Sequence, residues 1–429
     1  MDKIILLKRT AIQSVALMIA VITLSYAFRQ YHGVTISARD IHSAEAASIS
    51  NKDNKTLEPD TAAVDDIDRM GLQTTGEEQS QVLKSSGWPE NFSALDSEIM
   101  GQLGNKLLVI KKPAADGLTM TLEDLYLTKS VLIKFGSTQT SRMDSLSIGR
   151  INEGDIFTGE PNFKELEDII TNPDDGTVQT VITKDYGRDI VHGISFTYSE
   201  TPGLYNTELL LELDNVYVHI VMEDDQYYYI GLKKPADVYD RIVVLDAGHG
   251  GKDAGALSKD ETVYEKNVNL KILLELKELL DKENIKVYYT RLADDKVFLK
   301  PRVGLANAVD CDFFISIHCN ANGSTRASGT EIYYVDTEFK RVKAETLAKI
   351  INEELGNTMP LTNRGLVERK KEDIYILNHA VVPAILIETG YMTNQKDLQY
   401  LIKEGNQKAI ARAIYTGILR AYDELYPAK

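Results

Sequence analysis

The second half of the chain alternates apolar runs with amphipathic stretches, and this alternation constrains the fold more than any other feature. Short apolar runs ending at Gly or Asn indicate strands, and stretches with apolar residues three or four apart indicate helices. The expected strands are 241–247, 285–291, 311–320, 329–335 and 383–390, and the expected helices are 263–284, 298–309, 338–356 and 406–426. Strands separated by helices predict an α/β fold, an open mostly parallel or mixed sheet with helices on both faces. We expect this domain to span 238–429.

The segment before it, 91–237, has the period-two alternation of β-strands. The clearest runs are 118–128, 130–136, 177–184, 190–198 and 207–234. The last is expected to be a three-stranded meander that turns at Asp214-Asn215 and at Glu223-Asp224-Asp225. We expect a β-rich accessory domain here, which is either a binding module or a folded spacer.

The N-terminus has the composition of an export signal. Lys3, Lys8 and Arg9 precede an apolar run over 11–28, which is long enough to cross a bilayer as a helix. Residues 1–36 are therefore expected to be a cytoplasmic start and signal anchor, with everything after them outside the cell membrane. A cleaved signal peptide remains the alternative, and the protein would then be secreted. Residues 37–90, rich in Ser, Thr and acidic residues, are expected to be a disordered acidic linker.

Charge and cysteine content narrow the choice of partners. The formal net charge is −16, which argues against nucleic acid as a partner because nucleic acid selects basic surfaces. The two cysteines, Cys311 and Cys319, would lie roughly 26 Å apart if one extended strand carried both, at about 3.3 Å per residue. A disulfide needs Cα atoms within about 7 Å, so we expect two free thiols.

Metal-binding side chains stand where expected strands end and helices begin. His249 follows the first strand among glycines, His318 lies near the end of the third, Glu388 lies in the late strand, and Glu265 begins the first helix. The carboxyl ends of parallel strands collect at one edge of a sheet, so these residues can converge. Two imidazoles and a carboxylate suit Zn²⁺ with one position open for water, and the remaining carboxylate can act as general base.

Each residue also has a simpler interpretation. A histidine beside glycines is often only a loop residue, and His318 could be a hydrogen-bonded core histidine. Glu265 could simply favour the positive end of its helix. Glu388 is harder to explain this way, because a buried carboxylate needs a partner. Their common placement at one sheet edge is what favours a site.

The stretch from about 240 to 429, which contains these residues, resembles the zinc-dependent N-acetylmuramoyl-L-alanine amidases of the Amidase_3 type. The matching segments are VVLDAGHGGKDAGA (243–256), EKNVNL (265–270), YTR (289–291), RVGLAN (302–307), DFFISIHCNA (312–321), GTEIYY (329–334) and PAILIETGYMTN (383–394). The resemblance implies His249, Glu265 and His318 as zinc ligands and Glu388 as the catalytic carboxylate. It also places Arg302 and Asn320 around the site, as substrate-contacting or supporting residues.

The resemblance implies a hydrolase that cuts peptidoglycan between the lactyl group of N-acetylmuramic acid and L-alanine of the stem peptide. The β-rich segment is similar in position and type to the modules that target such enzymes to the wall, the AMIN class among them, and it could instead dock a cell-wall or divisome protein. Alternative functions are a zinc peptidase acting on the stem peptide, although HExxH is absent, and a non-catalytic peptidoglycan-binding protein or activator.

Two departures from the family pattern stand out. ILNHAVVPA precedes the late strand where the family commonly has a Leu-Arg pair, and this leaves His379 as an unassigned imidazole. Some relatives carry a long insertion after the third strand that plugs the zinc site. Here only the short connection NGSTRAS intervenes, so we expect no autoinhibition of that kind.

Overall fold

The computed structural model describes residues 101–112, 117–137, 148–171, 178–201, 204–370 and 373–426. The expected signal anchor and acidic linker lie outside these residues. Within the described ranges no helix is long and apolar enough to span a membrane.

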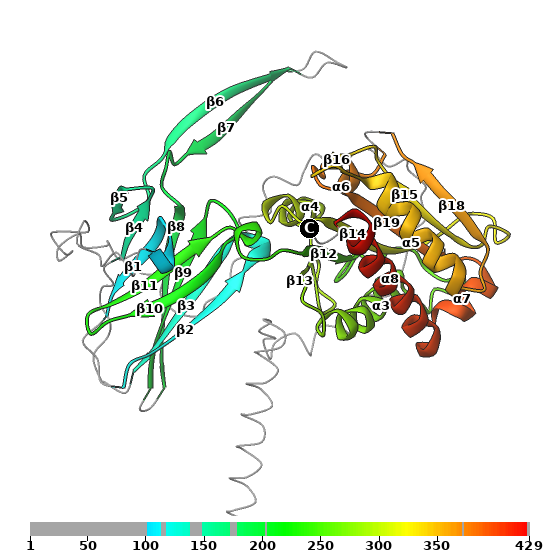
Figure 1. The fold of residues 1–429 in the computed structure, drawn as a ribbon, viewed down its shortest axis with the longest axis horizontal. Coiled ribbons are helices and arrows are strands. Elements are labelled where there is room, and N and C mark those ends of the chain that lie inside the picture. Colours follow the sequence, from blue (N-terminus) through cyan, green and yellow to red (C-terminus); the bar gives the residue numbers. More distant parts are fainter. Residues whose placement is uncertain are drawn as a thin grey trace, which may run out of the picture. The chain divides into compact units, whose positions relative to one another are not determined.

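The C-terminal region is a six-stranded mixed sheet in the order β13-β12-β14-β19-β15-β18 (Figure 1). The strands are β12 (Ile242–Ala247), β13 (Lys286–Tyr289), β14 (Phe313–Asn320), β15 (Thr330–Tyr334), β18 (Asn363–Glu368) and β19 (Ala384–Tyr391). All neighbouring pairs are parallel except β15 and β19. This confirms the predicted α/β fold with a mixed sheet.

Helices cover both faces of this sheet, as the alternation of apolar residues requires. They are α3 (Glu265–Leu280), α4 (Leu299–Ala308), α5 (Ala344–Thr358), α6 (Tyr375–Asn378), α7 (Gln395–Leu401) and α8 (Glu404–Leu425). Val243 and Leu245 of β12 share a core with α3, α5 and α8, whereas Ile242 and Val244 pack with α4 and α6 on the other face. Successive strand residues point to opposite faces, so one fully buried strand serves both cores.

Two expectations for this region were wrong in detail. The helix expected over 338–356 begins at Ala344, because residues 338–343 form a hairpin of β16 (Glu338–Phe339) and β17 (Val342–Lys343). Lys340 and Arg341 adopt positive φ in its turn, which a helix cannot contain. The edge strand β18 was not expected, because its partly exposed, charged sequence NRGLVE lacks an apolar run.

The N-terminal region is β-rich, as predicted. Its strands are β1 (Lys106–Lys111), β2 (Thr119–Leu125), β3 (Ser130–Ser137), β4 (Ile148–Asn152), β5 (Asp155–Thr158), β6 (Lys164–Thr171), β7 (Val178–Asp185), β8 (Val191–Thr201), β9 (Leu204–Leu213), β10 (Val218–Glu223) and β11 (Tyr227–Lys233). They form a five-stranded sheet, β10-β11-β1-β4-β5, a four-stranded sheet, β2-β3-β9-β8, and the hairpin β6-β7. Apolar residues of both larger sheets share one core, for example Leu108 with Ile133 and Leu209.

The expected meander over 207–234 was wrong in its pairing. Three strands are present and the turns fall where expected, but β9 pairs with β3 and β8, while β10 pairs with β11 in the other sheet. The chain crosses between sheets near Asp214, whose carboxylate accepts a hydrogen bond from Tyr217 (2.9 Å). Alternation identified the strands but not their partners, which are set by contacts distant in sequence.

Candidate metal centre

His249 is held in an unusual backbone conformation directly after β12. Its φ is 63°, a left-handed value that a non-glycine residue adopts only when the surrounding structure enforces it. A Cβ on the preceding Gly248 would meet the imidazole of His318 at 2.2 Å, so only glycine lets the two histidines approach. The ring centroids of His249 and His318 lie 4.9 Å apart.

Two buried arginines hold this turn through hydrogen bonds to its backbone carbonyls. Arg302 donates to the carbonyls of Ala247 (2.8 Å) and His249 (2.7 Å), and Arg291 donates to those of Ala247 (2.8 Å) and Gly248 (2.9 Å). Arg302 also pairs with the buried Asp246 at 2.5 Å. Arg302 was expected near the site as a substrate-contacting or supporting residue, and its contacts are those of a support for the His249 turn.

Glu265 is the first residue of α3 and lies between both histidines. Its Oε2 is 3.2 Å from Nε2 of His249, and its Oε1 is 2.9 Å from Nδ1 of His318. The backbone N–H groups of Ala256 (2.7 Å) and Cys319 (2.9 Å) also donate to it. Burial alone would raise the pKa of Glu265, but the hydrogen bonds with the two histidines hold this pKa well below its usual range.

The donor atoms of His249, Glu265 and His318 all lie within 4.8 Å of one another, close enough to ligate one ion. Asp253 adds an outer support, since its Oδ2 is 2.9 Å from Nδ1 of His249. A carboxylate behind a ligating imidazole fixes the orientation of the ring. Two imidazoles and one carboxylate therefore fit a divalent metal, and this is the cluster that the sequence predicted.

Glu388 lies beside the cluster on β19, directly opposite His318 of β14 and Glu331 of β15 in strand register. Its carboxylate is buried, and Oε2 has no hydrogen-bond partner among the described residues. Burial, together with the negative charges of Glu265 and Glu331, raises the pKa of Glu388 well above its usual range. A carboxylate with an unsatisfied oxygen and a raised pKa is suited to take up a proton.

Beyond Glu388 lies a network that the sequence analysis did not assign. Glu331 Oε1 accepts hydrogen bonds from Asn320 (2.6 Å), Tyr333 (2.9 Å) and Tyr391 (2.8 Å). Asn320 was expected around the site and does lie there, bound to Glu331. Glu331 stands in the quoted segment GTEIYY, but nothing in its local pattern distinguishes it from an ordinary strand residue.

The remaining expectations concern residues outside the cluster. His379 ends α6, stacks on Tyr375 with ring centroids 3.9 Å apart, and is not among the clustered ligands. The connection between β14 and β15 is short, as expected. Cys311 and Cys319 are both free and buried, which confirms the prediction of two unpaired thiols.

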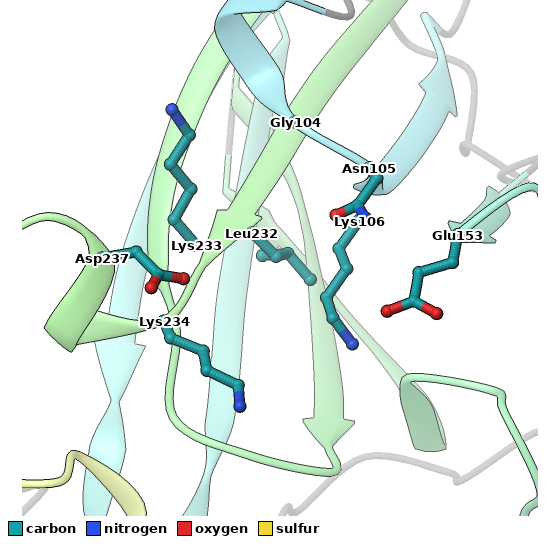
Figure 2. A pocket seen from close by; sticks show the side chains of 8 residues that line it. All are labelled: Gly104, Asn105, Lys106, Glu153, Leu232, Lys233, Lys234 and Asp237. Atoms are coloured by element: carbon teal, nitrogen blue, oxygen red, sulfur yellow. The ribbon is translucent and has the colours of Figure 1, made fainter.

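A separate pocket of about 470 Å³ lies in the β-rich region, lined by Gly104, Asn105, Lys106, Glu153, Leu232, Lys233, Lys234 and Asp237. Figure 2 shows these lining side chains, among them Lys106, Lys233 and Lys234. No metal-type group of histidines, cysteines and carboxylates other than the one above occurs in the described ranges. The candidate ligands found in these ranges therefore all lie in the α/β region.

Together, the α/β sheet, the His-Glu-His cluster and the adjacent carboxylate are consistent with a hydrolase that has a candidate metal site. The N-acetylmuramoyl-L-alanine amidase family matches residues 243–420. The uncharacterized protein YqiI of Bacillus subtilis is 34% identical over 184 residues, which cover 43% of this chain and 86% of YqiI. The germination-specific N-acetylmuramoyl-L-alanine amidase of the same organism is 31% identical over 198 residues, covering 43% of this chain and 81% of that protein.

The chain therefore belongs to the N-acetylmuramoyl-L-alanine amidase family, and the triad is the metal-binding cluster typical of that family's zinc site. The probable cell wall amidase LytH of Staphylococcus epidermidis is 37% identical over 179 residues. That alignment covers 42% of this chain and 57% of LytH. The family match begins only after the last strand of the β-rich region, so it says nothing about that region's role.

Proposed function

We propose that the α/β region hydrolyses the amide between the lactyl group of N-acetylmuramic acid and L-alanine of the peptidoglycan stem peptide, with zinc held by His249, Glu265 and His318. The observation that carries this proposal is the register of Glu388. It stands directly opposite one ligand of the cluster, and one of its carboxylate oxygens has no hydrogen-bond partner among the described residues. Family membership supports the choice of bond.

Each residue of the site has a distinct role, which follows from its position. Bound zinc would supply Lewis-acid polarisation of the scissile carbonyl and lower the pKa of a water molecule. Glu388 takes the proton from the attacking water and returns it to the leaving amine of L-alanine. Arg302 and Arg291 keep His249 in place through the backbone carbonyls of its turn. The products are a lactyl carboxylate and a stem peptide with a free amino terminus.

The test is digestion of purified peptidoglycan by the chain from about residue 90, with zinc, alongside Glu388→Gln and a chelated sample. New L-alanine amino termini that are absent from both controls would support the amidase. New termini elsewhere in the stem would make the protein a peptidase. Binding without cleavage would leave only the non-catalytic alternative.

We also propose that the protein is exported and held at the cell membrane by the apolar run over 11–28. The length of this run and the basic residues before it support an uncleaved anchor. The mature N-terminus and membrane fractionation test this. A terminus shortly after the run would mean a cleaved signal and a secreted enzyme.

For the β-rich region we propose a docking role toward the wall or a cell-wall protein. Lysines border its pocket, although the chain as a whole is strongly acidic. This local positive charge supports an anionic group as the bound partner. The Lys233→Ala/Lys234→Ala double variant should release the protein from sedimented wall material at lower salt. Unchanged salt dependence would make the region a spacer.

A further inference from the structure

A row of charged side chains crosses four neighbouring strands on one face of the α/β sheet. His318 of β14 is the register partner of Glu388 of β19, and Glu388 is the register partner of Glu331 of β15. Residues directly opposite one another on neighbouring strands point to the same face. Arg364 of the edge strand β18 completes the row, because its Nε donates to Glu331 Oε2 at 3.2 Å.

Arg364 is anchored on one side by Glu331 and Tyr391. Glu331 holds its Nε, and its guanidinium carbon lies 5.6 Å from the ring centroid of Tyr391. The side chain is still 44% exposed. Within the described ranges neither terminal nitrogen has a hydrogen-bond acceptor. A fixed guanidinium whose two terminal nitrogens face outward can bind a carboxylate in bidentate fashion.

Acidic side chains on the same face of the sheet make a cation favourable at the position of Arg364. Glu388 and Glu331 both carry carboxylates on the same face, and the whole chain has a net charge of −16. An acidic substrate lying along the row would be repelled without a compensating cation. A second arginine, Arg369, directly follows β18, and its guanidinium carbon lies 4.1 Å from the ring centroid of Tyr333. Its buried Nε has no partner among the described residues.

The spacing of the row fits a peptide. Neighbouring strands lie about 4.8 Å apart, so three steps separate the backbones at His318 and Arg364 by roughly 14 Å. An extended peptide advances about 3.3 Å per residue, and the reach of the arginine side chain shortens the path. A carboxylate roughly two to four residues from the scissile amide would therefore meet Arg364.

We propose that Arg364 is a specificity-determining residue that binds a carboxylate of the stem peptide. This inference rests on the proposed amidase function and extends it by assigning the orientation of the substrate. The glycan side of the scissile bond lies toward β14 and the peptide side toward β18. Tyr391 and Glu331 act as positioning residues that hold the guanidinium.

The test compares muramoyl peptides that carry a free stem carboxylate with the same peptides carrying a carboxamide there. The wild type should prefer the carboxylate by about 10–100-fold in kcat/KM, the range of a charged hydrogen bond. Arg364→Gln should remove this preference by raising KM for the carboxylate peptide only. Arg364→Lys should keep part of it. Arg412→Gln, an exposed arginine on α8, is the matched control and should change nothing.

Two results would overturn the inference. One is a wild type that does not discriminate between the two peptides. The other is an Arg364→Gln variant whose kcat falls equally on both peptides. Glu331→Gln should show the same equal loss if the Arg364–Glu331 pair only shapes the site. Calorimetric measurement of stem-peptide binding distinguishes failure of the Arg364 inference from failure of the proposed amidase function. If no peptide is cleaved but Arg364→Gln still weakens binding of the carboxylate form about 10-fold or more, only the amidase proposal is lost.

Discussion

The β-rich region and the α/β region each contain a buried arginine–aspartate pair, and the two pairs serve different purposes. Arg150 and Asp189 of the β-rich region have side chains only 1% and 4% exposed. Arg302 and Asp246 of the α/β region have side chains 3% and 1% exposed. Arg150 directs its remaining contact to the carbonyl of Gly159, between strands, whereas Arg302 contacts the carbonyl of His249, a candidate metal ligand.

The comparison teaches that burial of charge does not by itself mark a functional site. Both pairs have the same chemistry and nearly the same burial. The pair at Arg150 connects β4 to the start of β8 and ends there, since Asp189 also accepts from Val191 N (3.1 Å). The pair at Arg302 contacts His249, which belongs to a cluster whose donor atoms converge. What distinguishes them is where the remaining hydrogen bonds lead.

The largest expected effect separates catalysis from fold. Glu388→Gln should lower kcat by about 10²–10⁴-fold, the usual contribution of a positioned general base. Zinc binding and the unfolding free energy should stay near the wild-type values, because Glu388 is not part of the ligand cluster. Kinetics on muramoyl peptides and zinc titration measure both. The matched control is Glu167→Gln on β6, an exposed carboxylate of the β-rich region, which should leave kcat unchanged.

Breaking each buried pair is the next test. Arg150→Met and Arg302→Met should each lower the unfolding free energy by about 3–5 kcal/mol, because each leaves a buried aspartate without its partner. Only Arg302→Met should also weaken zinc binding, by about 10–100-fold, the usual cost of removing an outer support of a ligand. Urea unfolding and zinc titration of the folded fraction measure the two effects. Equal zinc affinity in both variants would contradict the distinction drawn here.

The ligand cluster was predictable from sequence because its residues stand at strand ends and at a helix start. His249 after β12, Glu265 at the start of α3 and His318 near the end of β14 follow from local patterns, and topology brings such ends to one edge. Motif resemblance made the choice specific. The family match and the gathered donor atoms agree with that prediction.

The residues that sequence could not assign act through long-range contacts. Glu331 is important only because antiparallel pairing places it opposite Glu388, and one register step would turn it to the other face. Arg364 lies on an edge strand whose exposed sequence gives no strand signal. The partners of β9 and β10 were misassigned for the same reason, since alternation encodes a face and not a neighbour.

Metal removal should affect the two regions unequally. Zinc at 100 times its dissociation constant should stabilise the α/β region by about 2.7 kcal/mol, because only the folded cluster gathers the ligands. His318→Ala should abolish this gain. His192→Ala is the matched control in the β-rich region, where the histidine stacks on Tyr186 at 4.0 Å between centroids. Thermal unfolding with zinc and with chelator gives the measurement, and a gain retained by His318→Ala would exclude His318 as a ligand.

The smallest expected effect uses the free thiols as reporters of the α/β region alone. Both cysteines are buried there, and burial raises the pKa of each thiol well above its usual range. The thiolate is the reactive form, so a thiol-specific reagent should label the folded protein only through opening of this region. In denaturant both thiols should react.

Under native conditions Arg150→Met should therefore leave the labelling rate within about twofold of wild type, although it destabilises the β-rich region by about 3–5 kcal/mol. The reason is that Cys319 belongs to a hydrophobic core that shares no residue with the core of the sheets around Arg150, so its labelling rate is the one to compare. Arg302→Met should speed labelling strongly. Equal acceleration by both variants would mean that the two regions open as one cooperative unit, and the buried pair at Arg150 would then support the metal centre through global stability.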